Sequence, residues 1–292
     1  MGENNPARLD EPGAPILETF QVSDGYRFYY RHYAPAGRPR AAVVFLHGIQ
    51  SHGGWYGGTC AALKDAGFAV YFLDRRGAGL NTAHRGDAPN FRRLLDDVGE
   101  FVKLGPPAVS PELPRFLVAI SWGGKLGVGV QYRYPGLVDG LALLCPGFFP
   151  QVRPNIRTRV SVARARLRNP GKFFRIPLNE PELFTASPRW QGFIARDRYG
   201  LREATARLMV ESISLDIYLR RAWKWVRVPV LLMLAGRDRV IDNPKTRAYV
   251  EKFPSADKQV IEYPEAHHTL EFEPDPGVYR RDLLHWLERH LT

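Results

Sequence analysis

The 292-residue sequence predicts an α/β fold built around a mostly parallel, doubly wound sheet. Continuous runs of Val, Ile, Leu and Phe recur along the chain, and such runs are typical of strands buried on both faces. Helix-compatible stretches separate these runs, which predicts parallel strands joined by crossover helices. The expected strands lie within residues 41–48, 69–79, 115–121, 138–147, 229–238 and 258–266, and the expected core helices within 54–67, 91–105 and 124–135.

Two segments depart from this rhythm. Residues 17–23 and 26–35 alternate in polarity around Asp24-Gly25, which predicts an antiparallel hairpin that brings the sheet to eight strands. Between about Pro150 and Trp225 the strand pattern stops, and helix formers and arginines dominate. We expect a helical cap inserted after the sixth strand, over the sheet edge where ligands bind. The expected organisation is a flexible N-terminal arm (1–16), a core (17–150 and 226–292) and a helical cap (151–225).

The composition excludes several classes of protein. Hydrophobic residues make up 45% of the chain and charged residues 24%, which is ordinary for a globular protein and unlike a disordered one. No apolar run is long enough for a membrane span, and the N-terminus lacks a signal-peptide pattern. The two cysteines, Cys60 and Cys145, form no metal-binding cluster and no disulfide framework. We therefore expect a cytoplasmic protein.

Three polar residues come directly after three expected strands. Ser121, Asp238 and His268 should meet, because parallel strands end at one edge of a sheet. Their order along the chain is the order of the triad in α/β hydrolases. Ser121 would be the nucleophile, His268 the proton acceptor and donor, and Asp238 the group that orients the imidazole. The alternative for Ser121 alone is a serine that caps the next helix.

Rival residues exist for the acid and the base. Asp242 lies further from its strand end than Asp238, and Asp216 belongs to the expected cap. His267 adjoins His268 and competes with it. We favour Asp238 and His268, because each stands where the strand ends would bring it to Ser121.

An ester hydrolase also needs backbone donors for the developing oxyanion. The tight turn at Ser121 would aim the Trp122 N–H at that oxygen, and the loop after the third strand would supply the Ile49 N–H. His47, in the same loop, is expected to brace it. Ala119 stands where the usual elbow motif has glycine; its one extra methyl group should be tolerated because the mechanism needs no positive φ there.

A strongly basic segment lies inside the expected cap. Residues 153–175 hold eight basic residues and no acidic one, within a chain of formal net charge +11. On a helix, Ile156, Val160, Ala163 and Leu167 share one face and arginines occupy another. Three interpretations remain open: an apolar face packed on the core with arginines in water, contact with an anionic membrane, and binding of an anionic substrate. Nucleic acid is disfavoured, because no binding module is recognisable.

Five motifs together resemble the α/β hydrolases of the monoacylglycerol lipase and lysophospholipase type. They are FLHG, DRRGAG, AISWGG, GRDRVID and HHTLEFE, and the resemblance runs from about Phe20 to the C-terminus. It implies the α/β-hydrolase fold, with the oxyanion loop on 47–49 and the triad on Ser121, Asp238 and His268. It further implies an ester substrate with an apolar acyl group, such as a monoacylglycerol or lysophospholipid, an acyl-enzyme, and no cofactor or metal. Thioester hydrolysis, acyl transfer, cofactor-free perhydrolysis and a non-catalytic ligand-binding protein are the alternatives.

Overall fold

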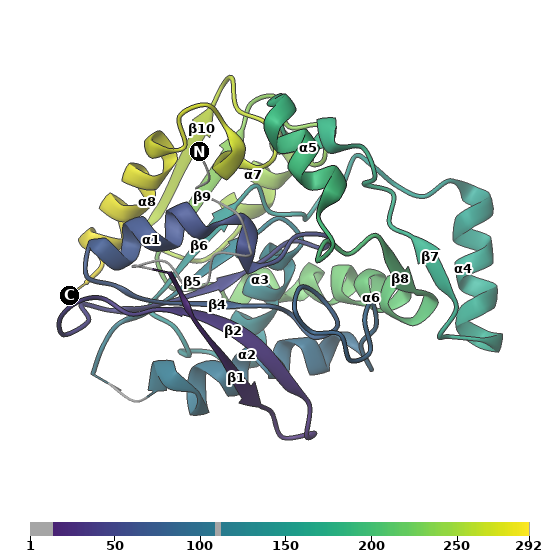
Figure 1. Ribbon diagram of the computed structural model, residues 1–292, viewed down its shortest axis with the longest axis horizontal. Helices are drawn as coiled ribbons and strands as arrows, with labels where there is room; N and C mark the ends of the chain where they lie inside the picture. Colours follow the sequence, from purple (N-terminus) through teal and green to yellow (C-terminus); the bar gives the residue numbers. More distant parts are fainter. Residues whose placement is uncertain (1–13, 109–111, 292) are drawn as a thin grey trace.

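A central eight-stranded sheet organises the molecule (Figure 1). The computed structural model describes residues 14–108 and 112–291. The sheet has the order β1-β2-β4-β3-β5-β6-β9-β10. The strands are β1 (Ile16–Gln21), β2 (Arg27–Tyr33), β3 (Ala42–Leu46), β4 (Ala69–Leu73), β5 (Arg115–Ile120), β6 (Gly140–Leu144), β9 (Val230–Ala235) and β10 (Lys258–Tyr263).

The pairing of the strands confirms the predicted sheet. β3, β4, β5, β6, β9 and β10 are parallel, whereas β1 and β2 form an antiparallel hairpin that joins β4 at one edge. Every residue of β3, β4, β6 and β9 is buried, which explains their continuous apolar runs. Gly25 turns the hairpin at φ +82°, a conformation that glycine adopts without a Cβ penalty. The arm expected over 1–16 lies outside the described residues up to residue 13, and β1 begins at Ile16.

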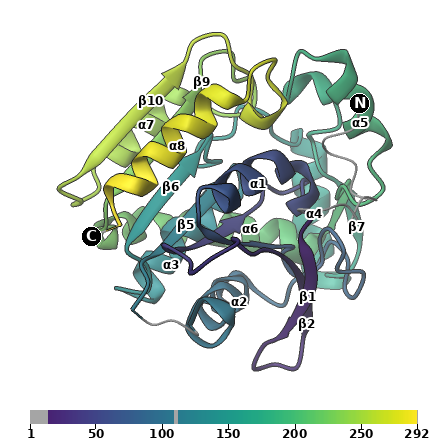
Figure 2. The same ribbon diagram turned by 60° about the vertical axis from the view of Figure 1, so that its left-hand side comes forward.

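Helices cover both faces of the sheet (Figure 2). α1 and α8 lie together on one face, and α2, α3 and α7 lie on the other. Where the structure is described, no helix combines the length and the apolar character needed to cross a membrane. The bounds are α1 (Gly57–Asp65), α2 (Phe91–Leu104), α3 (Gly123–Arg133), α7 (Asn243–Glu251) and α8 (Gly277–Arg289).

The segment between β6 and β9 forms the cap. It contains α4 (Ile156–Arg168), β7 (Phe173–Arg175), α5 (Pro188–Arg196), β8 (Glu203–Thr205) and α6 (Ala206–Ala222). The helices α4, α5 and α6 confirm the predicted helical insertion after the sixth strand, and β7 and β8 add a two-stranded antiparallel sheet that the sequence analysis did not predict. Strands of three residues are too short to show a period of two, so they left no pattern to detect.

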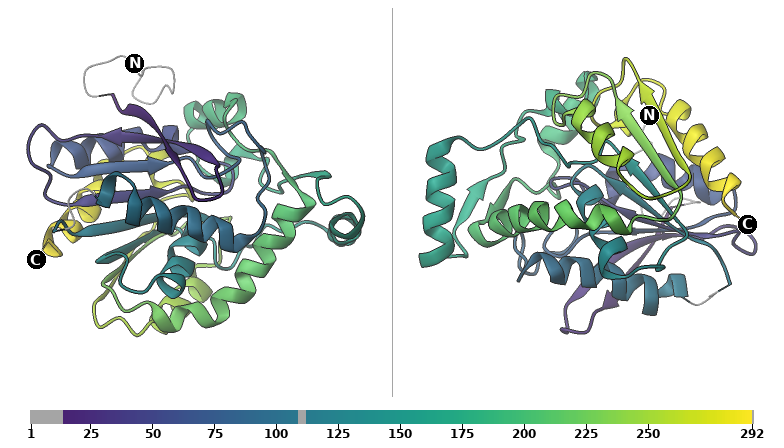
Figure 3. Two further views of the ribbon diagram at one scale, coloured as in Figure 1. Left: turned by 90° about the horizontal axis from the view of Figure 1, so that it is seen from below. Right: turned by 180° about the vertical axis from the view of Figure 1, so that it is seen from behind.

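Helix α4 forms the outermost part of the cap (Figure 3). Its contact with α6 is made by Val162 and Ala165, which are both buried. The face predicted to be apolar is instead solvent-exposed: Ile156 is 67% exposed and Leu167 is 87% exposed. The interpretation in which this face packs on the core is therefore wrong. The sequence correctly predicted that these apolar side chains share one face of α4. The contact with α6, however, is made by Val162 and Ala165 on the opposite face.

Candidate active site

Ser121 lies in a sharp turn between β5 and α3. Its φ is +50°, in the left-handed region that a residue with a Cβ adopts only under strain. Three backbone hydrogen bonds hold the turn: the Ser121 N–H donates to Leu144 O (2.9 Å), and the Ser121 carbonyl accepts from Gly124 (2.9 Å) and Gly147 (2.7 Å). This geometry is that of a nucleophile elbow rather than of a helix cap, because α3 begins two residues later without a side-chain cap.

The residues on either side of this turn are small for identifiable steric reasons. A Cβ at Gly123 would lie 2.6 Å from Leu46 O and 2.7 Å from His47 O, which leaves room only for glycine. On the other side, the Ala119 methyl group faces Gly127, where an added Cβ would come within 2.9 Å of it. The Ala119 methyl group, which the usual motif lacks, is therefore accommodated because Gly127 in α3 has no side chain.

His268 joins Ser121 to Asp238. The distance from Ser121 Oγ to His268 Nε2 is 2.8 Å, and that from His268 Nδ1 to Asp238 Oδ2 is 2.7 Å. The other carboxylate oxygen of Asp238 accepts from the N–H groups of Val240 (2.7 Å) and Ile241 (3.0 Å). The Asp238 side chain is fully buried and the His268 side chain is 2% exposed. The three residues that the sequence placed at one sheet edge thus form one hydrogen-bonded chain.

The rival residues have other partners. Asp242 caps α7 by accepting from the Lys245 N–H (3.0 Å). Asp216 pairs with Lys125 at 2.6 Å. His267 lies next to Glu273, with its Nδ1 3.2 Å from the carboxylate. None of these three hydrogen bonds or ion pairs includes Ser121.

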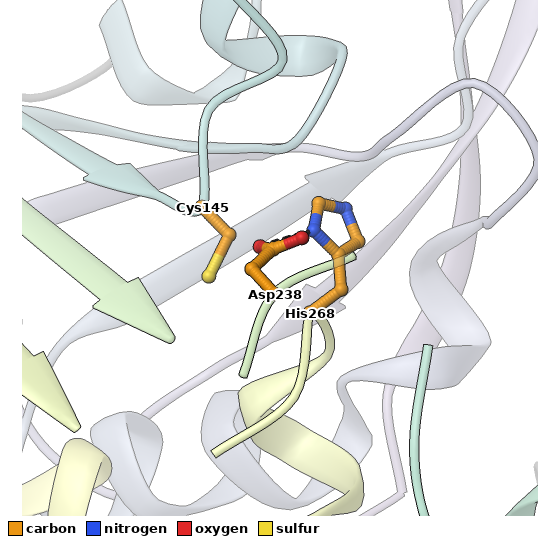
Figure 4. A group of neighbouring side chains, drawn as sticks. All are labelled: Cys145, Asp238 and His268. Atoms are coloured by element: carbon orange, nitrogen blue, oxygen red, sulfur yellow. Dashed lines mark hydrogen bonds and ion pairs between the residues drawn. The ribbon is translucent and has the colours of Figure 1, made fainter. Parts of the chain in front are cut away.

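Cys145 adjoins the acid and the base, and sequence reasoning missed it (Figure 4). It follows β6 with φ +42°, and one ligand-type atom from each of Cys145, Asp238 and His268 lies within 4.8 Å of the others. Burial and the Asp238 carboxylate raise the pKa of the Cys145 thiol well above its ordinary value, so it stays protonated. Asp238 and His268 are hydrogen-bonded to each other, as the acid and the base of a triad are. The three side chains around Cys145 therefore fit a triad with a neighbouring thiol better than a metal centre.

The loop after β3 packs directly against Ser121. A Cβ at Gly48 would lie 3.1 Å from Ser121 Cβ, so a side chain there would force Ser121 to shift. His47 Nδ1 lies 2.7 Å from Gly48 O, and His47 Nε2 accepts from the Arg75 N–H at 2.8 Å. Burial, followed by the charge of Arg75, lowers the pKa of His47 to about 3, so the ring is neutral and donates from Nδ1. This contact orients the peptide that carries the Ile49 N–H, which is the bracing role expected for His47.

Arg75 is a second residue that sequence reasoning missed. Its Nη2 donates to Ile49 O (3.1 Å), and its guanidinium lies over the Trp122 ring, 4.9 Å from the centroid. Arg75 is 8% exposed, and burial lowers its pKa to about 10, which leaves it charged at neutral pH. It therefore places a positive charge beside both residues expected to form the oxyanion hole. The available signal was its position in DRRGAG, directly after a buried strand.

The cap closes over this edge of the sheet through contacts with three core loops. Leu201 N donates to Gln50 O, and Thr269 N donates to Phe184 O, both at 2.9 Å. The indole of Trp122 donates to Ser212 Oγ at 2.9 Å. These contacts hold the cap against the loops at the sheet edge where Ser121 lies.

The sheet order, the strained serine turn and the hydrogen-bonded Ser–His–Asp chain define an α/β hydrolase. Residues 37–275 match the Hydrolase_4 family, described as serine aminopeptidase, S33, and the chain belongs to this family. Its relatives include lipases, and the protein is a hydrolase of the lipase and esterase kind.

Named relatives cover nearly the whole chain. A monoacylglycerol lipase from Mycolicibacterium smegmatis is 27% identical over 288 residues, which cover 94% of this chain and 97% of the relative. A monoglyceride lipase from Rattus norvegicus is 25% identical and covers 86% and 82%. The solved structure of a soluble variant of monoglyceride lipase from Saccharomyces cerevisiae has a TM-score of 0.85 at 19% identity, covering 98% and 99%. That last likeness concerns the fold alone.

Proposed function

We propose that the protein is a serine esterase that cleaves carboxylic esters with an apolar acyl group, such as monoacylglycerols or lysophospholipids, through an acyl-enzyme. The observation that carries this proposal is the unbroken hydrogen-bonded chain from Ser121 through His268 to Asp238. The names of the two relatives, monoacylglycerol lipase and monoglyceride lipase, support an acylglycerol as substrate.

The proposed reaction has two halves. Ser121 Oγ attacks the ester carbonyl while its proton passes to His268 Nε2, and Asp238 stabilises the imidazolium. His268 then protonates the departing alcohol, and a water molecule, activated by His268, hydrolyses the acyl-enzyme and frees Ser121. The N–H groups of Ile49 and Trp122 hold the oxyanion, and in support, neither donates a hydrogen bond within the described chain. Every proton in this scheme is carried by the triad, so the proposal calls for no cofactor or metal.

A panel of p-nitrophenyl esters of increasing acyl length tests the reaction. Ser121→Ala should lower kcat by about 10⁴-fold or more, because the nucleophile is lost. Ser161→Ala, an exposed serine on α4, is the matched control and should keep wild-type turnover. Turnover that survives Ser121→Ala would refute the mechanism. Assays with a thioester substrate, and with an added alcohol as acyl acceptor, distinguish ester hydrolysis from thioester hydrolysis and acyl transfer. Tight binding of esters without turnover would favour a ligand-binding protein.

We further propose that the enzyme acts in the cytoplasm at an anionic lipid surface, with α4 as the docking helix. At about 100° per residue, Arg157, Arg164 and Arg168 flank the exposed apolar stripe on one side and Arg159 flanks it on the other. In the described chain, none of these four arginines has a carboxylate within 4.0 Å. A projecting helix with an apolar stripe between unpaired arginines suits the boundary between acyl chains and anionic headgroups.

Vesicle sedimentation tests this docking. The wild type should bind vesicles that contain anionic lipid and lose most of the binding at high salt. The double variant Ile156→Ser/Leu167→Ser should bind much less, whereas Ile213→Ser, at a similarly exposed position on α6, should bind like the wild type. Equal partitioning of all forms would exclude α4 as the docking helix, and a role in binding an anionic substrate would then remain.

A further inference from the structure

The cap contributes most of the walls of a cavity that lies apart from the triad. The cavity has a volume of about 660 Å³ and lies between the β7–β8 sheet, the segment before α5 and the loop that follows α5. Four arginines line it: Arg85, Arg175, Arg198 and Arg202. Ser121, Asp238 and His268 are not among its lining residues. An inference from this cavity therefore stands independently of the proposed esterase chemistry.

Within the described chain, the four arginines of this cavity have no carboxylate partner, unlike several other arginines of the protein. Arg76 pairs with Asp97 at 2.8 Å, and Arg207 pairs with Asp87. By contrast, no carboxylate of the described residues lies within 4.0 Å of any of the four cavity arginines. Among the described residues, Glu203 is the only acidic one in the lining, and it is the cross-strand partner of Arg175. Four guanidinium groups thus face one carboxylate, and the cavity is strongly electropositive.

Three of these guanidinium groups are held in place by groups that carry no charge. Arg85 donates to the carbonyls of Tyr199 (2.9 Å) and Gly200 (3.2 Å). Arg202 donates to a carbonyl at the end of α5, and Arg198 lies over the Tyr199 ring at 4.7 Å. Carbonyls and aromatic rings fix the direction of a guanidinium without neutralising it. These three guanidinium groups are therefore oriented before any anion arrives, which lowers the entropic cost of binding.

We infer that this cavity binds a phosphate ester. Guanidinium groups match phosphate oxygens bidentately, and several converging on one space favour a multiply charged oxyanion. The cavity is far larger than a phosphate ion, so the ligand carries an organic part. Phe173, Pro181 and Leu201 supply apolar wall for that part. A soluble phosphate ester and the headgroup of an anionic lipid share this chemistry.

Calorimetric titration of the full chain with glycerol 3-phosphate at low salt tests the site. Arg175→Gln/Arg198→Gln should weaken binding about tenfold or more, because two of the four charges are removed. Glu203→Gln should tighten binding, because it removes the opposing charge. Arg220→Gln/Arg221→Gln, at exposed positions in the last turn of α6, removes the same charge outside the cavity and outside α4 and should bind like the wild type. Unchanged ester turnover and thermal midpoint show that each variant is folded.

The arms of the experiment also identify the source of the ligand. Saturable binding of glycerol 3-phosphate, weaker for inorganic phosphate and dependent on Arg175 and Arg198, supports a soluble phosphate ester. Binding that depends on the same two arginines only with vesicles containing phosphatidic acid supports a lipid headgroup. If the cavity variant and the α6 variant lose binding equally, or if neither probe binds in a way that depends on the cavity, the inference is wrong.

Discussion

Ala119 and Gly127 face each other where β5 meets α3, and a Cβ added at Gly127 would lie only 2.9 Å from the Ala119 Cβ. The strand and the helix approach this closely because the turn at Ser121 folds one directly back along the other. The space between β5 and α3 at this point holds one methyl group. In this protein the strand carries the methyl group and the helix carries the glycine.

The pair predicts a strong coupling in stability. Gly127→Ala should lower the free energy of unfolding by about 1–2 kcal/mol, because overpacking outweighs the higher helix propensity of alanine. In the Ala119→Gly background the same substitution should cost clearly less, because the closest contact is gone and only Leu141 Cδ1, at 3.2 Å, remains near the new methyl group. Urea denaturation of the wild type, the two single variants and the double variant measures the coupling. Additive effects of the two substitutions would show that the two residues do not compete for one space.

Substitution of Asp238 and substitution of Asp242 should have very different effects on kcat. Asp238→Asn should lower kcat by about 10⁴-fold, because asparagine no longer holds His268 in the tautomer that accepts a proton. Asp242→Asn should change kcat little, because Asp242 caps α7 and asparagine is an equally good cap. Turnover of one p-nitrophenyl ester by both variants provides the measurement. Comparable losses in the two variants would contradict the assignment of Asp238.

Buried His47 should make stability depend on pH. Its pKa is about 3 in the folded protein, chiefly through burial, and about 6.5 in the unfolded chain. Between these two pH values the His47 imidazole is protonated in the unfolded chain and neutral in the folded protein. Stability is therefore full above pH 6.5 and falls as the pH drops, by about 2 kcal/mol between pH 7 and pH 5.

His47→Asn isolates this contribution, because the asparagine amide can still donate to Gly48 O. Urea denaturation at pH 7 and pH 5 should show a smaller loss for His47→Asn than for the wild type. His32, whose pKa is also lowered by burial, is present in both proteins and cancels. His285→Gln, at an exposed position, is the control. An identical loss for His47→Asn and the wild type would contradict a buried neutral imidazole.

Much of the fold could be predicted because the core strands carry their own signal. β3, β4, β6 and β9 are buried along their whole length, so each appears as an uninterrupted apolar run. Ser121, Asp238 and His268 follow such runs, and the parallel sheet brings the ends of those runs together. The three-residue strands β7 and β8 could not be predicted, because their pairing depends on segments about 30 residues apart.

The sequence by itself determined the sheet, the order of the triad, and the apolar and basic faces of α4. These features follow from local periodicity and from where strands end. Only the tertiary structure decided which face of α4 is buried. A single helix does not encode its partner, and here Val162 and Ala165 meet α6 while Ile156 and Leu167 face outward. Contacts across distant segments likewise decided that Gly127 accommodates Ala119 and that Arg75 lies beside Ile49 and Trp122. They also decided that arginines from a strand and from separate loops share one cavity.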